Sequence, residues 1–352
     1  MTSNIKYESF YKLDIDNILG EIIMKDYEKE LQKHEQIKES NSAAENVIKF
    51  YSMNKSFCDK AYNYYKEYKN FKNLFLDSQN ISVQSFIKNL GANPILIVTS
   101  NPIEEAILLH SLFDYTKKRL KCFFIEDYVY GIAKIKKYTI VHIHTKSTGE
   151  ESARVAINAA TKIFSPIYVF LLGICYGFDH ESHVLGTVVI SNKVLGLHVD
   201  FRDYSYEFIE EFNKQPDLRL IDKLENRLNY FQPENKLLND SVNMTAKTGI
   251  IISINSLVSN KKFKNSLFNA YKIKPRPLGG EMEVKGLFKT DWFENQGQKK
   301  WLVIKSICDW GESKNLPNLK KEEKEKIKDS LQALAMSYTW TIFEMIIENE
   351  LI

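Results

Sequence analysis

The hydrophobic positions divide the chain into two parts with different periods. Up to about residue 92, apolar residues recur every three or four positions, which predicts amphipathic helices. One such stretch lies over residues 15–34 and another over residues 44–74, and the polar residues 40–42 between them can cap the second helix. We therefore expect residues 1–92 to form an all-helical N-terminal module of two or three helices.

From residue 93 the pattern changes to short, continuously apolar runs that alternate with helical segments. Runs of this kind are typical of strands that are buried on both faces of a sheet. The expected strands lie at residues 94–98, 122–125, 138–144, 166–178, 186–191, 249–258 and 301–309. The expected helices lie at residues 106–112, 150–163, 203–247 and 319–352. This alternation predicts an α/β domain over residues 93–352.

Composition narrows the class of protein. The apolar fraction of 44% allows a sizeable core, and the net charge of +3, with Lys alternating with Glu, does not favour a nucleic-acid partner. The four cysteines are far apart and form no C-x-x-C pair, so we expect neither disulfides nor a zinc site. The polar N-terminus lacks a signal-peptide core, and no apolar run reaches the roughly 18 residues that span a bilayer. We expect a cytoplasmic protein without membrane contact, metal or cofactor.

Carboxylates gather in two places in the last third of the chain. Residues 279–286 read Gly-Gly-Glu-Met-Glu-Val-Lys-Gly, and the apolar run at residues 301–309 ends in Asp309. Ligands of α/β proteins bind off the carboxyl ends of strands, which favours chemistry at Asp309. From the spacing alone, however, Glu283 is equally well explained as a surface carboxylate, and Asp309 as the cap of the next helix.

Two further pairs of polar residues lie in or just after expected strands. Glu104 and Glu105 follow the first apolar strand at the start of a helix, where acidic side chains favour the positive end of the helix dipole. His142 and His144 share one face of a strand at a spacing that can bind metal, but no third ligand is near in the sequence. We expect the two histidines to pack across strands.

The carboxylate segments resemble the paired motifs of the nucleoside phosphorylase/nucleosidase superfamily. Glu281-Met282-Glu283 resembles its E-M-E-(G/A) box, and residues 305–309 resemble its (R/K)-x-I-(S/C)-D strand end. Three other segments resemble its G-x-x-G-G loop, its G-D-(V/I)-V-(V/I)-S strand and its (G/S)-G-D-x-F-I strand end, and they lie at residues 173–177, 186–191 and 249–258. The resemblance runs from about residue 92 to the end of the chain. It implies a central mixed twisted sheet flanked by helices.

The resemblance also implies an activity, the hydrolysis of the N-glycosidic bond of a purine nucleoside, as in methylthioadenosine/S-adenosylhomocysteine nucleosidases. A purine leaves poorly unless its N7 is protonated, and Asp309 is implied as the acid. Glu283 is implied to bind the ribose hydroxyls, with Met282 packed on the sugar. Glu104 is implied to position the attacking water, with Glu105 as the neighbouring alternative. These roles resemble the two-carboxylate chemistry of glycoside hydrolysis.

The remaining implied contacts lie around the base and the ribose. Glu281 belongs to the same ribose box, and Gly173 lies in the loop beside base and ribose. Leu257 and Val258 are implied to supply the backbone and the apolar wall that read a purine. Tyr176 stands where the family has the second glycine of its loop, so we expect it to narrow the pocket or to stack on the ligand.

The charge of the loop after the first strand indicates whether water or phosphate accepts the sugar in the reaction. Family phosphorylases carry a Gly-rich, Arg-containing loop after the first strand, whereas residues 99–104 contain neither residue and end in Glu104. A glutamate at this point repels phosphate, which favours water as the acceptor. A phosphorolytic purine nucleoside phosphorylase is the alternative.

Basic residues flank the ribose box. Lys272, Lys274 and Arg276 precede the box, and Lys285 follows it. Such side chains can engage 5′-phosphates, so adenosine, methylthioadenosine, AMP and ATP are all candidate substrates that would release adenine.

Family members are oligomers in which a neighbour often completes the pocket, so we expect a homo-oligomer. Residues 1–92 are interpreted either as a packing appendage or as a partner-binding or sensing module. This module resembles the extensions of superfamily members that accompany bacterial immune modules, which implies a nucleotide-depleting effector in antiviral defence. Tyr176, Thr187 and Asn255 depart from the family pattern, so a catalytically inactive nucleoside-sensing module is a further alternative.

Overall fold

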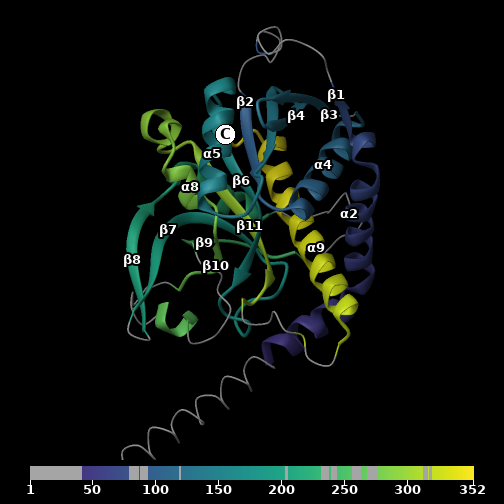
Figure 1. Cartoon of the computed structure of the whole chain (residues 1–352), viewed down its shortest axis with the longest axis vertical. Coiled ribbons are helices and arrows are strands. Elements are labelled where there is room, and N and C mark those ends of the chain that lie inside the picture. Colours follow the sequence, from purple (N-terminus) through teal and green to yellow (C-terminus); the bar gives the residue numbers. More distant parts are fainter. Residues whose placement is uncertain are drawn as a thin grey trace, which may run out of the picture.

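The computed structural model describes residues 42–78, 87, 94–118, 120–202, 205–230, 238, 244–255, 263–267, 276–311, 316 and 319–352. The helix expected over residues 15–34 lies outside these residues. The described chain folds around one central mixed sheet that is flanked by helices (Figure 1). The α/β architecture that the alternating pattern predicted is therefore confirmed.

In the described residues the sheet has 11 strands, and their order in space differs from their order in the chain. Ten of them follow one path: β1 (Leu76–Ser78), β3 (Leu120–Ile125), β4 (Tyr128–Ile135), β5 (Tyr138–His144), β2 (Pro94–Thr99), β6 (Tyr168–Gly177), β10 (Gly279–Glu281), β9 (Ala246–Ile254), β7 (Val188–Arg202) and β11 (Trp301–Asp309). The other strand, β8 (Ser205–Lys214), pairs with β7. Because β6 also pairs with β11, the strands β6, β10, β9, β7 and β11 close into a ring.

Three strands that carry or precede predicted site residues, β2, β6 and β11, run parallel to one another. β2 pairs with β5 and β6 in parallel, and β6 pairs with β11 in parallel. The carboxyl ends of β2, β6 and β11 therefore lie at the same edge of the sheet, which is where α/β proteins bind ligands. The short strand β10 pairs with the end of β6 and so brings the segment after it to the same edge.

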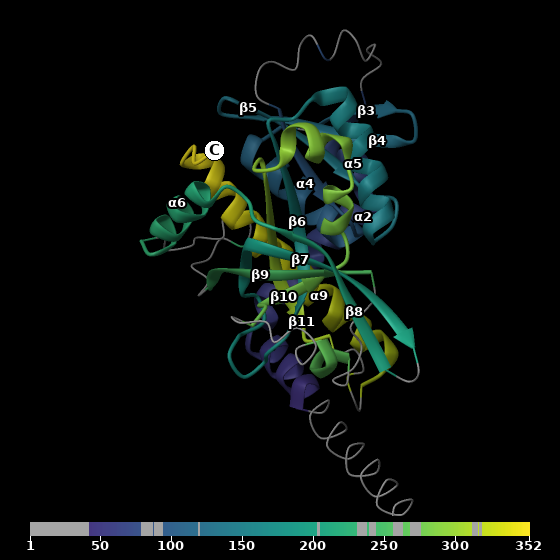
Figure 2. The same ribbon diagram turned by 90° about the vertical axis from the view of Figure 1, so that its left-hand side faces the viewer.

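Helices cover the sheet. They are an N-terminal helix at residues 42–53, α2 (Lys55–Phe75), α4 (Pro102–Thr116), α5 (Glu150–Phe164), α6 (Leu218–Leu228), α8 (Val284–Phe288), a π-helical turn (Phe293–Gly297) and α9 (Lys321–Glu348). α9 packs against α2 and α4 on one side and against β6 and β11 on the other (Figure 1). It is buried almost all round over residues 330–347, as expected for a central helix. Its C-terminal end lies beside α6 (Figure 2), where Lys223 Nζ donates to the carbonyl of Leu351 at 3.5 Å.

The described part of the N-terminal module shares the core of the α/β domain. Ala43, Val47, Cys58 and Ala61 are buried in the same apolar cluster as the strands and α9. β1, which follows α2 directly, adds a strand beside β3, so the described part of residues 1–92 contains a short strand beside the expected helices. The periodic stretch at residues 44–74 is helical as expected, although a turn at Asn54 divides it into two helices. The proposed boundary at residue 92 stays a prediction.

Two expectations about secondary structure are wrong. The region 203–247 was expected to be helical, but β8 forms a hairpin with β7, and the helix α6 occupies a shorter part of the region. The two-residue period of Tyr206 and Phe208 explains the strand, since both rings pack on Phe263, at 4.8 and 5.4 Å between centroids. The strand β4, which the expected elements omitted, completes an antiparallel pair with β3 and another with β5.

The histidine pair behaves as a packing feature. His142 is buried, and its Nε2 lies 2.9 Å from the hydroxyl of Thr99 on the neighbouring strand. The described residues include no cluster of His, Cys, Asp and Glu that could hold a metal ion. None of the described helices is both long enough and apolar enough to cross a bilayer.

The packing of α9 on the sheet yields a stability prediction. Phe343 of α9 is fully buried and meets Phe170 of β6 edge to face, at 5.1 Å between ring centroids. Phe343→Ala should lower the free energy of unfolding by about 3–5 kcal/mol, because it leaves a cavity that the surrounding elements cannot fill. Urea denaturation followed by circular dichroism measures this loss. The control is Phe124→Ala, whose ring is 72% exposed, and this change should stay within about 0.5 kcal/mol.

Candidate active site

Glu104 is held at the start of α4 by the end of β2. Asn101 caps the helix, and its side-chain oxygen accepts the backbone N–H groups of Ile103 and Glu104, each at 2.9 Å. One carboxylate oxygen of Glu104, Oε2, accepts the N–H of Ser100 at 2.7 Å and that of Asn101 at 3.2 Å. The side chain therefore folds back into the sheet edge and is only 1% exposed.

The second oxygen of Glu104 connects the helix to two other strands. Oε1 accepts the N–H of Ile174 in β6 at 2.9 Å and lies 3.9 Å from Lys305 Nζ in β11. Gly173 makes room for this contact, since a Cβ there would overlap the Glu104 carboxylate and lie 2.9 Å from Lys305 Nζ. The absence of a side chain at position 173 thus allows Glu104 and Lys305 to meet.

The ribose box brings two more buried carboxylates to the same place. Glu281 Oε2 accepts the N–H groups of Glu283 and Val284 at 2.8 and 3.0 Å, which closes the turn from β10 into α8. Glu283 Oε2 lies 3.5 Å from Lys305 Nζ, and its Oε1 accepts the N–H of Gly149 at 3.4 Å. Lys305 therefore stands between the carboxylates of Glu104 and Glu283.

The charges of this cluster depend on one another. Burial opposes the charge of Lys305, but the carboxylates of Glu104, Glu283 and Glu281 outweigh burial and raise the lysine pKa. Burial, together with the charge of Glu283, raises the pKa of Glu281 to about 8. Burial acts on Glu283 as well, but Lys305 and the neighbouring donors lower the pKa of that carboxyl. These opposite shifts favour a single negative charge on the pair around neutral pH, with Glu283 the more readily ionised of the two.

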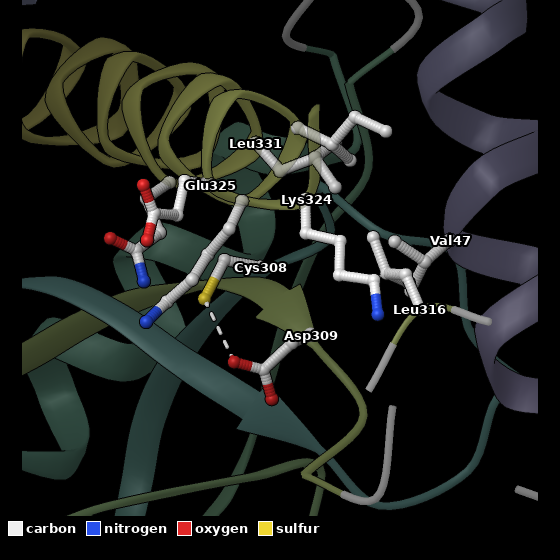
Figure 3. Close-up of a pocket in the computed structure, with 10 residues that line it drawn as sticks. Val47, Cys308, Asp309, Leu316, Lys324, Glu325 and Leu331 are labelled. Atoms are coloured by element: carbon white, nitrogen blue, oxygen red, sulfur yellow. Dashed lines mark hydrogen bonds between the residues drawn. The ribbon is translucent and has the colours of Figure 1, made fainter. Parts of the chain in front are cut away.

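Asp309 ends β11 beside a cavity. Its Oδ1 accepts the N–H of Gly311 at 2.7 Å, and the thiol of Cys308 lies 3.6 Å from its Oδ2. The carboxylate is half-buried and lines a cavity of about 190 Å³. Figure 3 shows Asp309 and Cys308 at the strand end, with Lys324 and Leu331 of α9 and Val47 of the N-terminal helix around the same space. Asp309 is thus reachable by a small ligand.

Tyr176 lies in the sheet between the strand that carries the ribose box and the strand that ends in Asp309. In β6 it is paired with Gly280 on one side and with Asp309 on the other, and its ring packs against Gly280. Burial and the charges of Glu281, Asp309 and Glu283 raise the pKa of the phenol. Its buried hydroxyl has no hydrogen-bond partner among the described residues. A hydroxyl without a partner in such a place is a ready donor for a ligand.

The structure places the other predicted residues as follows. Met282 is half-buried between Glu281 and Glu283. Lys285 is 1% exposed, and its Nζ is held by Glu211, by Glu150 at 3.1 Å and by the carbonyl of Leu197 at 3.1 Å. We therefore leave Lys285 out of the proposed phosphate contacts.

Arg276 is exposed at the start of the segment that leads to β10. Leu257 and Val258, together with Lys272 and Lys274, lie outside the described residues.

Lys305 is the functional candidate that the sequence-based list of site residues omitted. A lysine inside the apolar run Trp301–Asp309 was the available signal, because a charge in a buried strand needs a partner. Its two partners, Glu104 and Glu283, come from distant parts of the sequence, and the sheet alone brings them to it.

Comparisons with known proteins bear on the fold of the chain. No family model matches the sequence. A death domain-containing ATP nucleosidase from Amphimedon queenslandica is 25% identical over 203 residues, which are 53% of this chain and 37% of that protein. The chain thus spans well under half the length of this relative.

Solved structures share the fold. The 5′-methylthioadenosine/S-adenosylhomocysteine nucleosidase of Helicobacter pylori has a TM-score of 0.55 at 15% identity, over 73% of this chain and 99% of that one. The corresponding enzyme of Colwellia psychrerythraea, solved with adenine, has a TM-score of 0.52 at 19% identity, over 71% and 96%. The futalosine hydrolase of H. pylori has a TM-score of 0.52 at 15% identity, over 73% and 98%. The chain therefore shares the fold of these nucleosidases, as its motifs predicted.

The raised pKa of Glu281 predicts a pH dependence of stability. Between its usual 4.5 and about 8, Glu281 binds a proton in the folded state that the unfolded chain does not bind. The contribution of Glu281 to the stability of the folded state is therefore complete at low pH and is lost as the pH rises towards about 8. Glu281→Gln mimics the protonated acid. Between about pH 5.5 and about pH 8.5 the variant should therefore lose about 1–3 kcal/mol less of its free energy of unfolding than the wild type does.

Urea denaturation at several pH values measures this difference between Glu281→Gln and the wild type. Glu45→Gln, at an exposed position of the N-terminal helix, is the control and should follow the wild-type curve. Parallel curves for wild type and Glu281→Gln would show that Glu281 is ionised in the folded protein.

Proposed function

We propose that this chain hydrolyses the N-glycosidic bond of a purine nucleoside or nucleotide and releases the free base. The observation that carries the proposal is the meeting of Glu104 and Glu283 at the buried ammonium of Lys305. This cluster lies just beyond the carboxyl end of β2 and beside the middle of β6 and β11, and Asp309 ends the strand that carries Lys305. The fold shared with purine nucleosidases supports the same activity.

Asp309 is proposed as the general acid. A purine departs as a neutral molecule once N7 has received a proton, and a carboxylic acid beside a small cavity can supply it. The backbone N–H of Gly311 fixes one oxygen of Asp309, which leaves Oδ2, beside the thiol of Cys308, to face the base. The hydroxyl of Tyr176, which has no hydrogen-bond partner among the described residues, is proposed to share the recognition of the base or of the ribose.

Glu283 is proposed to bind the ribose and to stabilise the cation that forms on it. Breaking the bond leaves positive charge on the sugar, and an ionised carboxylate nearby lowers the energy of that state. Lys305 and the donors around Glu283 keep this carboxyl ionised, as its lowered pKa indicates. Met282, between the two glutamates, packs on the sugar.

Glu104 is proposed to position the water. The backbone N–H groups of Ser100, Asn101 and Ile174 hold its carboxylate in one orientation, so it can accept a hydrogen bond from water at a defined point. Two carboxylates face a single ammonium here, and a phosphate dianion would add further negative charge. This balance supports water rather than phosphate as the acceptor.

The proposed substrates are adenine nucleosides and nucleotides, from adenosine and methylthioadenosine to AMP and ATP. The names of the relatives support adenine as the base, and the ATP nucleosidase supports a 5′-phosphorylated substrate. We also propose a homo-oligomer, a partner for the N-terminal module and a cytoplasmic location, in which the four free cysteines stay reduced. Nucleotide depletion in antiviral defence is the proposed biological output.

Direct assay tests the activity. The full chain is incubated with each candidate substrate, with and without phosphate, and free adenine is measured by chromatography. We expect adenine without phosphate, and ¹⁸O from labelled water in the sugar product. A sugar 1-phosphate would instead show phosphorolysis, and substrate binding without release would support the sensing alternative.

Asp309→Asn tests the acid. It should lower kcat by about 10²- to 10⁴-fold, because the amide cannot donate the proton that N7 needs. The same variant should keep most of its rate on the N7-methylated form of the substrate, whose base is already cationic. Equal losses on both substrates would remove Asp309 from the acid role.

Glu104→Gln tests the water site, and its neighbour provides a matched control. Glu104→Gln should lower kcat by about 10²- to 10⁴-fold, since the amide orients water poorly. Glu105 faces Tyr68 of α2 instead of the cluster, so Glu105→Gln should keep a rate near that of the wild type. The reverse pattern of rates would assign the water to Glu105.

A further inference from the structure

The N-terminal helix at residues 42–53 reaches the acid side of the proposed site. Val47 from this helix lines the cavity that Asp309 also lines, and Figure 3 shows the two residues on neighbouring parts of that space. These residues belong to the region that sequence reasoning set apart from the catalytic domain. In the folded chain they form one wall beside the proposed acid.

A specific hydrogen bond joins this helix to the residue after Asp309. The indole Nε1–H of Trp310 donates to the side-chain oxygen Oδ1 of Asn46 at 3.1 Å. Trp310 is fully buried, and its ring lies so close to Gly177 that a Cβ there would overlap it. The ring is thus held by packing on β6 and by one polar contact from the N-terminal helix.

The orientation of Trp310 is coupled to that of the Asp309 carboxylate. Oδ1 of Asp309 accepts the N–H of Gly311 at 2.7 Å, so the carboxylate closes a turn that has Trp310 at its centre. A displacement of the packed indole would strain this turn, because Trp310 is its middle residue. The contact to Asn46 therefore acts on the acid through Trp310.

A second contact from the same helix supports this arrangement. The hydroxyl of Ser42 lies 3.4 Å from Nε2 of His180, whose ring is 6.1 Å from that of Trp310. His180 follows the end of β6, the strand that carries Gly177 and Tyr176. One turn of the helix thus contacts both segments that surround the acid.

We propose that Asn46 is a positioning residue for Asp309: by accepting the indole N–H of Trp310, it holds the turn that aims the proton donor at the departing base. The proposal rests on the function proposed above, since it concerns the acid of that reaction. It also makes the N-terminal helix part of the active site, so that any event that shifts this helix acts on base release.

Two substitutions at Asn46 separate the polar contact from simple packing. Asn46→Leu keeps the size but removes the acceptor, and we expect kcat to fall about tenfold or more with KM nearly unchanged. Asn46→Asp keeps an oxygen acceptor and should restore most of the rate. Lys49→Ala, at an exposed position of the same helix, is the control and should leave the kinetics unchanged.

The N7-methylated substrate distinguishes positioning of the acid from general damage. Its base needs no proton, so Asn46→Leu should lose rate on the ordinary substrate and keep it on the methylated one. Trp310→Phe removes the N–H donor, and in that background Asn46→Leu should have no further effect. Thermal unfolding of each variant, measured in parallel, confirms that the assays compare folded proteins.

The outcomes are distinct. Wild-type kinetics for Asn46→Leu, or equal losses on both substrates, would overturn the positioning role while leaving the proposed function standing. If Asn46→Leu fails to fold, two other variants test the proposal. Asn46→Asp must be active, and Trp310→Phe must lose rate on the ordinary substrate but keep it on the N7-methylated one. An inactive wild type would overturn the proposed function itself.

Discussion

The buried ammonium of Lys305 is the constraint on which the rest of the site depends. It is 2% exposed in the middle of a strand, where an unpaired charge would be strongly unfavourable. Its stability there requires carboxylates, and the fold supplies them from α4 and from the turn after β10. The dependence is mutual, because the carboxylates of Glu104 and Glu283 would repel each other without the cation between them. The ionised state of Glu283, which the proposed reaction requires, is thus a property of the cluster.

The ring of strands explains why such a cluster can form. β6 lies between β10 and β11, so residues of all three strands meet although they are far apart in the chain. β10 has three residues, and its pairing on both sides determines where Glu281 and Glu283 are placed. Gly173 is paired directly with Lys305 in the register of β6 and β11, and its missing side chain leaves the space that Glu104 fills.

Sequence patterns predicted the parts of this arrangement that are local. The continuous apolar runs identified β2, β6 and β11, because such a run depends on neighbouring residues only. Each motif is likewise a short local segment, and the order of the motifs along the chain identified the fold. The predictions that failed concern residues whose contacts are distant in the sequence. The partners of Lys285 lie in α5 and β8, so its flanking position suggested a phosphate contact that the folded chain does not favour. The prediction of a helix at β8 failed for the same reason, because Phe263, on which the rings of Tyr206 and Phe208 pack, is also distant in the sequence.

The two halves of the proposed reaction rest on different parts of the chain. The sugar side surrounds Lys305 of β11, and its carboxylates come from the start of α4 and from the turn after β10, which the paired strands hold in place. The acid side is enclosed by α9 and the N-terminal helix, which are joined to the sheet by side-chain packing. The solved nucleosidases match almost their whole length but only about 73% of this chain, so about a quarter of it has no counterpart in them. A wall built from helices can move more readily than a paired strand, since helices shift by sliding whereas strands must break hydrogen bonds. Proton donation, more than sugar binding, is therefore the step on which an added segment of the chain can act.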